Sequence, residues 1–81
     1  MKNSVRRHVV AEIRKRENVL IRISDCDLGG FRYGEIRQFY RDSFGEYVAS
    51  KKGVTFSPEL IGEIAAGLEQ LKDGFETTTT Q

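Results

Sequence analysis

The sequence contains a single cysteine, a single histidine and a single proline. Cys26 has no partner for a disulfide within the chain, which is typical of a reducing compartment, and we interpret it as a small buried or half-buried side chain. The lone histidine, His8, leaves neither a base paired with a nucleophile nor a set of ligands at metal-binding spacing. We therefore expect a protein that is not an enzyme and that carries neither a metal nor a cofactor.

Long hydrophobic runs are also lacking. No segment approaches the roughly 20 apolar residues that a membrane-spanning helix needs. The basic N-terminus, "MKNSVRRHVVAEIRK", interrupts its apolar residues with charges and so lacks the core of a secretion signal. We expect an intracellular protein with no membrane partner, cytoplasmic or nucleoid-associated in a prokaryote and nuclear in a eukaryote.

Length and charge narrow the remaining possibilities. The 81 residues are enough for one domain, and a domain this small buries only about 60% of its unfolded surface, so dimerisation would stabilise it. The net charge is +1, but residues 1–52 hold twelve Lys and Arg against seven Asp and Glu, whereas the rest hold one Lys against five acids. A basic surface can therefore bind phosphate although the whole chain is nearly neutral.

Three segments have the pattern of strands. Val19–Ile23 ("VLIRI") is rich in β-branched residues, and aromatic residues alternate with arginines from Phe31 to Arg41. A third, short strand is expected at residues 54–56. Gly34 lies inside the second segment and indicates a bulge or a bend.

The N-terminal segment "SVRRHVVAEIRKREN" is compatible with two structures. Val9, Ala11 and Ile13 would line one face of a strand, whereas Val5, Val9 and Ile13 would line a basic amphipathic helix. We favour the strand, and the helix stays open.

Polar stretches that contain glycine mark the expected turns. "SDCDLGG" has the composition of a turn or loop. In "RDSFGEY", Asp42 opens and Gly45 closes a hairpin turn. In "KKGVTF", a second tight turn is expected around Gly53.

The C-terminal part predicts one helix. Ser57 is a suitable N-cap, Pro58 suits the first helical position, and Gly74 can end the helix. Apolar residues recur at helical spacing at Leu60, Ile61, Ile64, Ala65, Leu68 and Leu71. Because the core is small and this stripe is wide, we expect an obligate homodimer with Leu60, Ile61, Ile64 and Leu68 in its interface.

These elements together predict an α+β fold, in which a curved four-stranded antiparallel sheet is followed by one helix (β-β-β-β-α). We divide the chain into a basic N-terminal arm (1–8), a single domain (9–75) and a disordered tail (76–81), because "ETTTTQ" has no apolar residue to bury.

Basic and aromatic residues interleave between residues 31 and 52. The cations are Arg32, Arg37, Arg41, Lys51 and Lys52, and the rings are Phe31, Tyr33, Phe39, Tyr40 and Phe44. Single-stranded nucleic acid binds to surfaces that combine cations for the phosphates with rings on which bases stack. Tyr33 and Phe39 are also compatible with a purely structural role in the core, whereas Tyr40 and Phe44 are expected to be exposed.

The run "IRQFYRDSFGEYVASKKGVTFSPEL" resembles the signature of the transcriptional coactivator family Positive Cofactor Four. The shared features are an Ile-Arg followed by an aromatic pair, a D-x-x-G-E hairpin, a basic pair before glycine, and a Pro-Glu helix start. The resemblance extends loosely over residues 13–71 and is weakest at "SDCDLGG". It implies a homodimer whose concave sheets bind single-stranded DNA with little sequence preference, in a bare bacterial or phage version of the family.

The resemblance also implies individual roles. The cations that contact DNA in the family would fall on Lys15, Arg22, Arg37, Lys51 and Lys52, and the stacking ring would fall on Tyr40. Phe31 is the candidate for a second stacking position, and a further family lysine is replaced by Val48. With Arg32 from the basic and aromatic pattern, these residues form the predicted nucleic-acid site.

Two other functions stay open. The domain could be a protein-interaction module within the transcription machinery, or it could prefer single-stranded or structured RNA to DNA. The natural target and the direction of regulation do not follow from the sequence.

Overall fold

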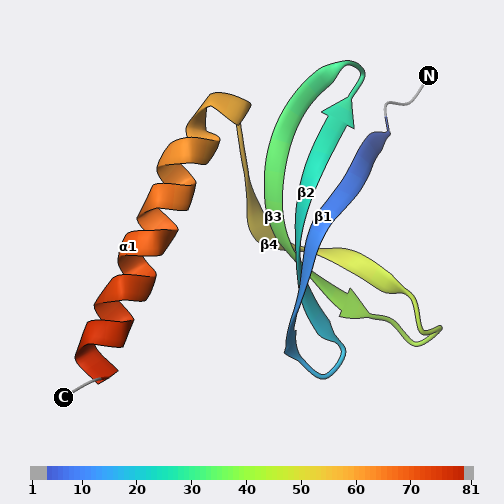
Figure 1. The fold of residues 1–81 in the computed structure, drawn as a ribbon. Coiled ribbons are helices and arrows are strands. Elements are labelled where there is room, and N and C mark those ends of the chain that lie inside the picture. Colours follow the sequence, from blue (N-terminus) through green and yellow to red (C-terminus); the bar gives the residue numbers. More distant parts are fainter. Residues whose placement is uncertain (1–3, 80–81) are drawn as a thin grey trace.

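The computed structural model describes residues 4–79, with side chains as far as residue 76. One sheet and one long helix are joined by a short 3-10 turn (Figure 1). The elements are β1 (Val5–Arg16), β2 (Val19–Leu28), β3 (Phe31–Arg41), β4 (Tyr47–Phe56), the 3-10 turn Pro58–Leu60 and α1 (Ile61–Thr79). The strands form an antiparallel sheet in the order β1-β2-β3-β4, which confirms the predicted α+β fold.

The N-terminal segment is a strand rather than a helix. β1 begins at Val5, opposite Leu28 of β2, and ends at Arg16, opposite Val19. Residues 5–8, which we expected in a separate basic arm, therefore belong to the sheet. The reason is that β2 is long enough to provide partners for them.

The loop predicted at "SDCDLGG" is wrong, because β2 continues to Leu28. Only Gly29 and Gly30 form the turn, and their φ angles of 60° and 92° are ones that favour glycine. Cys26 is fully buried, as expected, and Asp25 accepts hydrogen bonds from Arg32 of β3. Contacts across the sheet thus hold a polar sequence in an extended strand.

The predicted hairpin between β3 and β4 is confirmed. Asp42 Oδ1 accepts hydrogen bonds from the backbone N–H groups of Phe44 (2.8 Å) and Glu46 (2.9 Å). Gly45 has a φ of 84°, and its N–H donates to the Asp42 carbonyl at 3.1 Å. Phe44 lies at the tip and is 88% exposed.

β4 passes through Gly53 without turning, so the tight turn predicted there is wrong. Gly53 lies opposite Arg37 of β3, where a Cβ atom would be 2.8 Å from the Ile36 carbonyl oxygen and 3.0 Å from the Arg37 Cα. The glycine allows the two strands to approach closely. Gly34 likewise marks a close approach, to the Phe56 ring, and the pairing of β3 with β2 is regular there.

The Gly53→Ala variant is expected to lose about 1–3 kcal/mol of unfolding free energy, because the backbone atoms that its methyl group meets cannot turn aside as a side chain would. Urea denaturation at a fixed chain concentration measures this loss. Gly62→Ala is the control, since a Cβ at Gly62 in α1 has nothing within 4 Å. Equal losses in the two variants would contradict the close approach.

Residues 50–52 form a bulge in β4, because they lie opposite the single residue Gln38 of β3. The Ser50 hydroxyl donates to the Gln38 carbonyl at 2.7 Å and accepts from the Lys52 N–H at 3.0 Å. These bonds satisfy backbone groups that the regular ladder leaves unpaired. The side chains of Lys51 and Lys52 are exposed.

The sheet bends strongly toward one face. Within the described residues, the buried side chains all lie on that face: Leu20, Ser24 and Cys26 of β2, and Glu35 and Phe39 of β3. Arg7 of β1 lies opposite Cys26 of β2, which in turn lies opposite Tyr33 of β3. In a flat sheet Arg7 would therefore be about 20 Å from Phe39, because Tyr33 and Phe39 are six residues apart on β3. The Arg7 guanidinium carbon is nevertheless only 5.8 Å from the centre of the Phe39 ring. We call this side the concave face and the other side the convex face.

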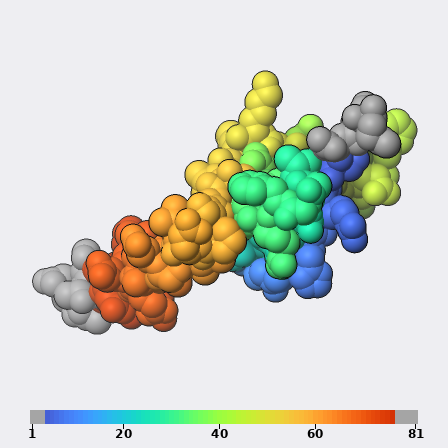
Figure 2. Space-filling model, turned by 90° about the horizontal axis from the view of Figure 1, so that it is seen from above, coloured from blue at the N-terminus to red at the C-terminus, as the bar shows by residue number. Residues whose placement is uncertain are grey.

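α1 projects away from the sheet as a separate arm (Figures 1 and 2). Pro58 occupies the predicted first position, but the Ser57 side chain makes no capping hydrogen bond. The radius of gyration of 15.2 Å exceeds the value of about 12 Å for a compact domain of this length. No helix within residues 4–79 is both long enough and apolar enough to span a bilayer.

The helix continues beyond its predicted end. Gly74 is not among the residues with positive φ, and α1 runs on to Thr79. Residues 76–79 of the predicted disordered tail are therefore helical, and residues 80–81 of that tail lie outside the described residues. A glycine that follows a helical turn does not end the helix unless it adopts the left-handed conformation.

Candidate nucleic-acid interface

A buried carboxylate lies at the centre of the concave face. The side chain of Glu35 is 2% exposed and accepts hydrogen bonds from Arg7 Nε (2.6 Å), Arg7 Nη2 (3.2 Å) and Arg37 Nε (2.6 Å). The two guanidinium groups come from β1 and β3. One carboxylate thus connects β3 with β1, a strand that does not pair with β3 directly.

The ionisation of this cluster follows from its geometry. Burial raises the pKa of Glu35, but hydrogen bonds from Arg7 and Arg37 outweigh burial and hold the pKa below its ordinary value of 4.5. Burial and the neighbouring Glu35 charge raise the pKa of the Cys26 thiol, which favours its unreactive protonated form. Within residues 4–79, no three His, Cys, Asp or Glu side chains are placed to hold a metal ion.

Arg22 lies between two aromatic rings on the same face. It pairs with Arg37 in the β2–β3 register, and its guanidinium carbon is 4.7 Å from the Phe39 ring centre and 5.6 Å from that of Tyr47. Its Nε donates to Glu12 Oε2 at 2.7 Å. These contacts fix a partly exposed cation on the concave face.

Arg37 connects the concave face with the β4 bulge. Its Nη1 donates to the Ser50 carbonyl oxygen at 2.9 Å. The bulge carries Lys51 and Lys52 at the β4 edge of the sheet. The fold therefore brings Arg37 close to the pair Lys51 and Lys52, which follow it by 14 and 15 residues in the sequence.

Tyr40 and Lys15 belong to the convex face. Lys15 Nζ donates to the side-chain oxygen of Gln38 at 2.7 Å, and Tyr40 follows Gln38 on that face of β3. Tyr40 pairs with Val48 of β4 and is 46% exposed. These two residues lie near the bulge but on the other side of the sheet from Arg37.

Phe31 and Arg32 lie at the opposite end of β3, about 25–30 Å along the strand from Tyr40. Phe31 is 65% exposed, and its ring centre is 6.0 Å from that of Tyr33. Arg32 is on the convex face, where it donates to both carboxylate oxygens of Asp25 at 3.1 and 2.5 Å. The fold thus separates these two predicted site residues from the others.

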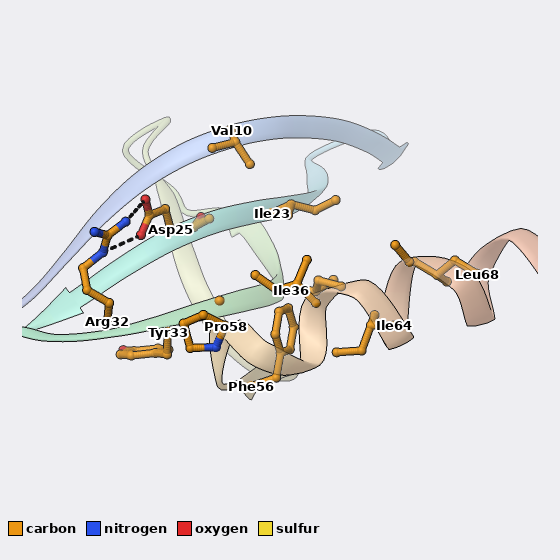
Figure 3. Close-up of a pocket in the computed structure, with 14 residues that line it drawn as sticks. Val10, Ile23, Asp25, Arg32, Tyr33, Ile36, Phe56, Pro58, Ile64 and Leu68 are labelled. Carbon is orange, nitrogen blue, oxygen red and sulfur yellow. Dashed lines mark hydrogen bonds and ion pairs between the residues drawn. The ribbon is translucent and has the colours of Figure 1, made fainter.

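A second surface lies between the convex face and the helix. An apolar cleft of about 540 Å³ opens there (Figure 3). Its lining includes Val10, Ile23, Ile36 and Phe56 of the sheet and Ile61, Ile64 and Leu68 of α1. Of the predicted interface residues, Leu60, Ile61 and Leu68 are 42%, 47% and 52% exposed, and Ile64 is half-buried.

Comparison with solved structures gives a clear similarity. The chain is similar to a PC4 homolog from Burkholderia pseudomallei, PC4 being Positive Cofactor Four. The orthorhombic crystal form has a TM-score of 0.76 at 29% identity, over 82% of this chain and 89% of that one. The tetragonal form has a TM-score of 0.78 at 28% identity, over 83% and 98%. The chain is a PC4-like protein. No protein-family model and no curated protein matches the sequence.

In this PC4-like chain, the sequence alone does not identify Arg7 and Glu35 as part of the site. Arg7 was assigned to the arm, and no local pattern connects it with a residue 28 positions away. Glu35 did give a signal, because it is the only acidic residue in β3. An isolated acid on a strand rich in arginine indicates an ion pair across the sheet.

Proposed function

We propose that this protein binds single-stranded DNA on the concave face, with little sequence preference and without catalysing a reaction. The observation that supports this most is that Arg22 packs on the Phe39 ring and pairs with Arg37, which in turn binds the bulge that carries Lys51 and Lys52. Cations beside aromatic rings are the combination that binds the phosphates and bases of a single strand. The likeness to a PC4 homolog supports the same class of ligand and a role as a transcription coactivator or regulator.

The bound strand crosses the concave face and leaves it over the β4 edge. The bulge lies opposite Gln38, which is between the concave residue Arg37 and the convex residue Tyr40 in sequence. A strand that passes Lys51 and Lys52 therefore reaches the exposed ring of Tyr40, with Lys15 nearby. Phe31 would bind only a longer strand, and Arg32 would take part only by giving up its ion pair with Asp25.

The Tyr40→Ala variant is expected to bind single-stranded DNA more weakly by roughly 1–3 kcal/mol, the worth of one stacked base. Fluorescence anisotropy with a labelled oligonucleotide measures the change. Tyr40→Phe keeps the ring and should bind as the wild type does. If Tyr40→Ala retained the wild-type affinity, Tyr40 would lie outside the site.

We also propose that a second copy of the chain covers the apolar cleft. Within the described residues only Leu20, Cys26 and Phe39 form a buried apolar core, which is little for a domain of this size. The cleft and the exposed stripe of α1 present a continuous apolar surface of the kind that marks an interface. A homodimer buries that surface and leaves the concave face of each copy open.

The proposed function is tested by titrating a labelled single-stranded DNA of about twenty nucleotides with protein at several salt concentrations, with unlabelled DNA duplex and RNA as competitors. We expect binding that weakens as salt rises and that resists the duplex. Displacement by RNA at lower concentration than by single-stranded DNA would make RNA the ligand. No binding at low salt would refute the proposal and favour a protein-interaction module.

A further inference from the structure

Arg7 is the cation on the concave face that neither the sequence pattern nor the family resemblance identified. It lies on β1, yet its guanidinium shares the Glu35 carboxylate with Arg37. Its guanidinium carbon and that of Arg22 are 5.8 and 4.7 Å from the centre of the same Phe39 ring. Three guanidinium groups from three adjacent strands therefore meet on one side of the sheet.

The anchoring bonds leave part of each guanidinium group available. Arg7 uses Nε and Nη2 for Glu35, Arg22 uses Nε for Glu12, and Arg37 uses Nε for Glu35 and Nη1 for a backbone carbonyl. Within the described residues, Nη1 of Arg7, both Nη groups of Arg22 and Nη2 of Arg37 make no hydrogen bond to the protein. Arg7 and Arg22 are each held by one edge, Arg37 is held through Nε and Nη1, and each of the three retains N–H donors for a ligand.

The charge and the accessibility of the three arginines are suited to binding an anion. The three arginines outnumber the two carboxylates that hold them, Glu12 and Glu35, by one positive charge. The arginine side chains are 32%, 22% and 18% exposed for Arg7, Arg22 and Arg37, so a ligand can reach them while much of the water is excluded. Guanidinium groups in this setting bind phosphate by charge-assisted hydrogen bonds.

We propose that Arg7, Arg22 and Arg37 form one phosphate-binding site on the concave face, and that buried Glu35 is its positioning residue. The ligand is a phosphodiester of the single strand, so this inference rests on the proposed function. Arg7 contacts the phosphate directly. Glu35 removes one unit of charge but holds Arg7 and Arg37 together, where they would otherwise repel each other.

Arg6 provides a matched control for Arg7. The two are neighbours with the same charge, but Arg6 lies on the convex face opposite Asp27. In the anisotropy titration, log Kd changes with log salt in proportion to the number of phosphate contacts, by about 0.7 per contact for a single strand. We expect Arg7→Gln to lower this slope by about 0.7 and Arg6→Gln to leave it unchanged. Equal slopes in the two variants would overturn the site.

Two further variants separate direct contact from a structural role. The double variant Arg7→Gln with Glu35→Gln removes one charge of each sign and leaves no unpaired carboxylate. We expect it to keep the lowered slope, because the contact is lost; a return to the wild-type slope would show that Arg7 only balances Glu35. Glu35→Gln alone makes the face more basic, yet it should bind more weakly, because the arginines are no longer fixed. Tighter binding would overturn the positioning role.

The binding of the wild type to the oligonucleotide tests the proposed function separately from this site. If the wild type and Arg6→Gln do not bind the oligonucleotide, the proposed function and this site fail together. If both bind and Arg7→Gln has the wild-type slope, only this site fails. Circular dichroism of each variant, recorded at the protein concentrations of the titration, confirms that folded protein is compared.

Discussion

The Glu35→Ala variant is expected to lose about 3 kcal/mol of unfolding free energy, which is a large part of the stability of so small a domain. Glu35 is the buried partner of two arginines, and its removal leaves both guanidinium groups without their counter-charge. The expected loss lies at the low end for a broken buried pair, because the side chain of Arg7 is 32% exposed and water can solvate it.

Urea denaturation at a fixed chain concentration measures this loss. Glu12→Ala is the control, because Glu12 also pairs with an arginine but its side chain is 49% exposed. An exposed ion pair contributes about 0–1 kcal/mol. Equal effects of the two substitutions would show that Glu35 does not organise the concave face.

The same carboxylate predicts a dependence of stability on pH. The pKa of Glu35 in the folded chain is held below 4.5, so its contribution to stability is present above pH 4.5 and is lost as the pH falls through the lower, folded-state pKa. We expect the urea midpoint of the wild type to fall more between pH 5 and 3 than that of Glu35→Gln. Parallel pH profiles would mean that this pKa is not lowered.

The Leu68→Asp variant is expected to abolish dimerisation. Leu68 lines the apolar cleft and is 52% exposed in the single chain. In the proposed dimer a carboxylate at this position would be buried without a partner in both copies. Burying one polar group without a partner costs about 1–3 kcal/mol, and a charged group costs more. Because the dimer buries two such carboxylates, its dissociation constant should rise by at least about 100-fold.

Sedimentation equilibrium measures the mass of each variant. The wild type is expected at the mass of two chains and Leu68→Asp at the mass of one. Gln70→Asp introduces the same charge on the opposite side of α1 and should leave the dimer intact. A wild type with the mass of one chain, or a Leu68→Asp variant with the mass of two, would contradict the proposed interface.

The parts of the fold that sequence predicts correctly are those set by local chemistry. The hairpin follows from an aspartate whose carboxylate caps its own turn and a glycine with positive φ. The start of the helical segment follows from Pro58. In both places, residues within one turn of each other determine the structure.

The errors occur where distant residues decide the conformation. A glycine can serve a turn or a close approach, and Gly53 serves the second because the backbone of β3 lies against it. Residues 24–28 are polar enough for a loop, but the cross-strand partners of Ser24 and Cys26, namely Glu35 and Tyr33, keep them extended. Neither distinction can be made from composition.

The candidate site was predicted only in part, because contacts between distant residues also decide which side chains share a face. The family resemblance proposed Arg22, Arg37 and the lysine pair, and the fold brings these together. It could not reveal that Tyr40 lies on the other face, or that Arg7 reaches the Phe39 ring, because both depend on strand register and on the bend of the sheet.

A nitrogen–proton NMR spectrum of the arginine Nε–Hε groups, recorded with and without single-stranded DNA, shows which face of the sheet binds the strand. If the concave face binds the strand, the signals of Arg22 and Arg37 shift and that of Arg32, paired with Asp25 on the convex face, stays in place. If anisotropy reports binding but only the Arg32 signal shifts, and those of Arg22 and Arg37 do not, the nucleic acid lies on the convex face and the concave face is not the binding surface.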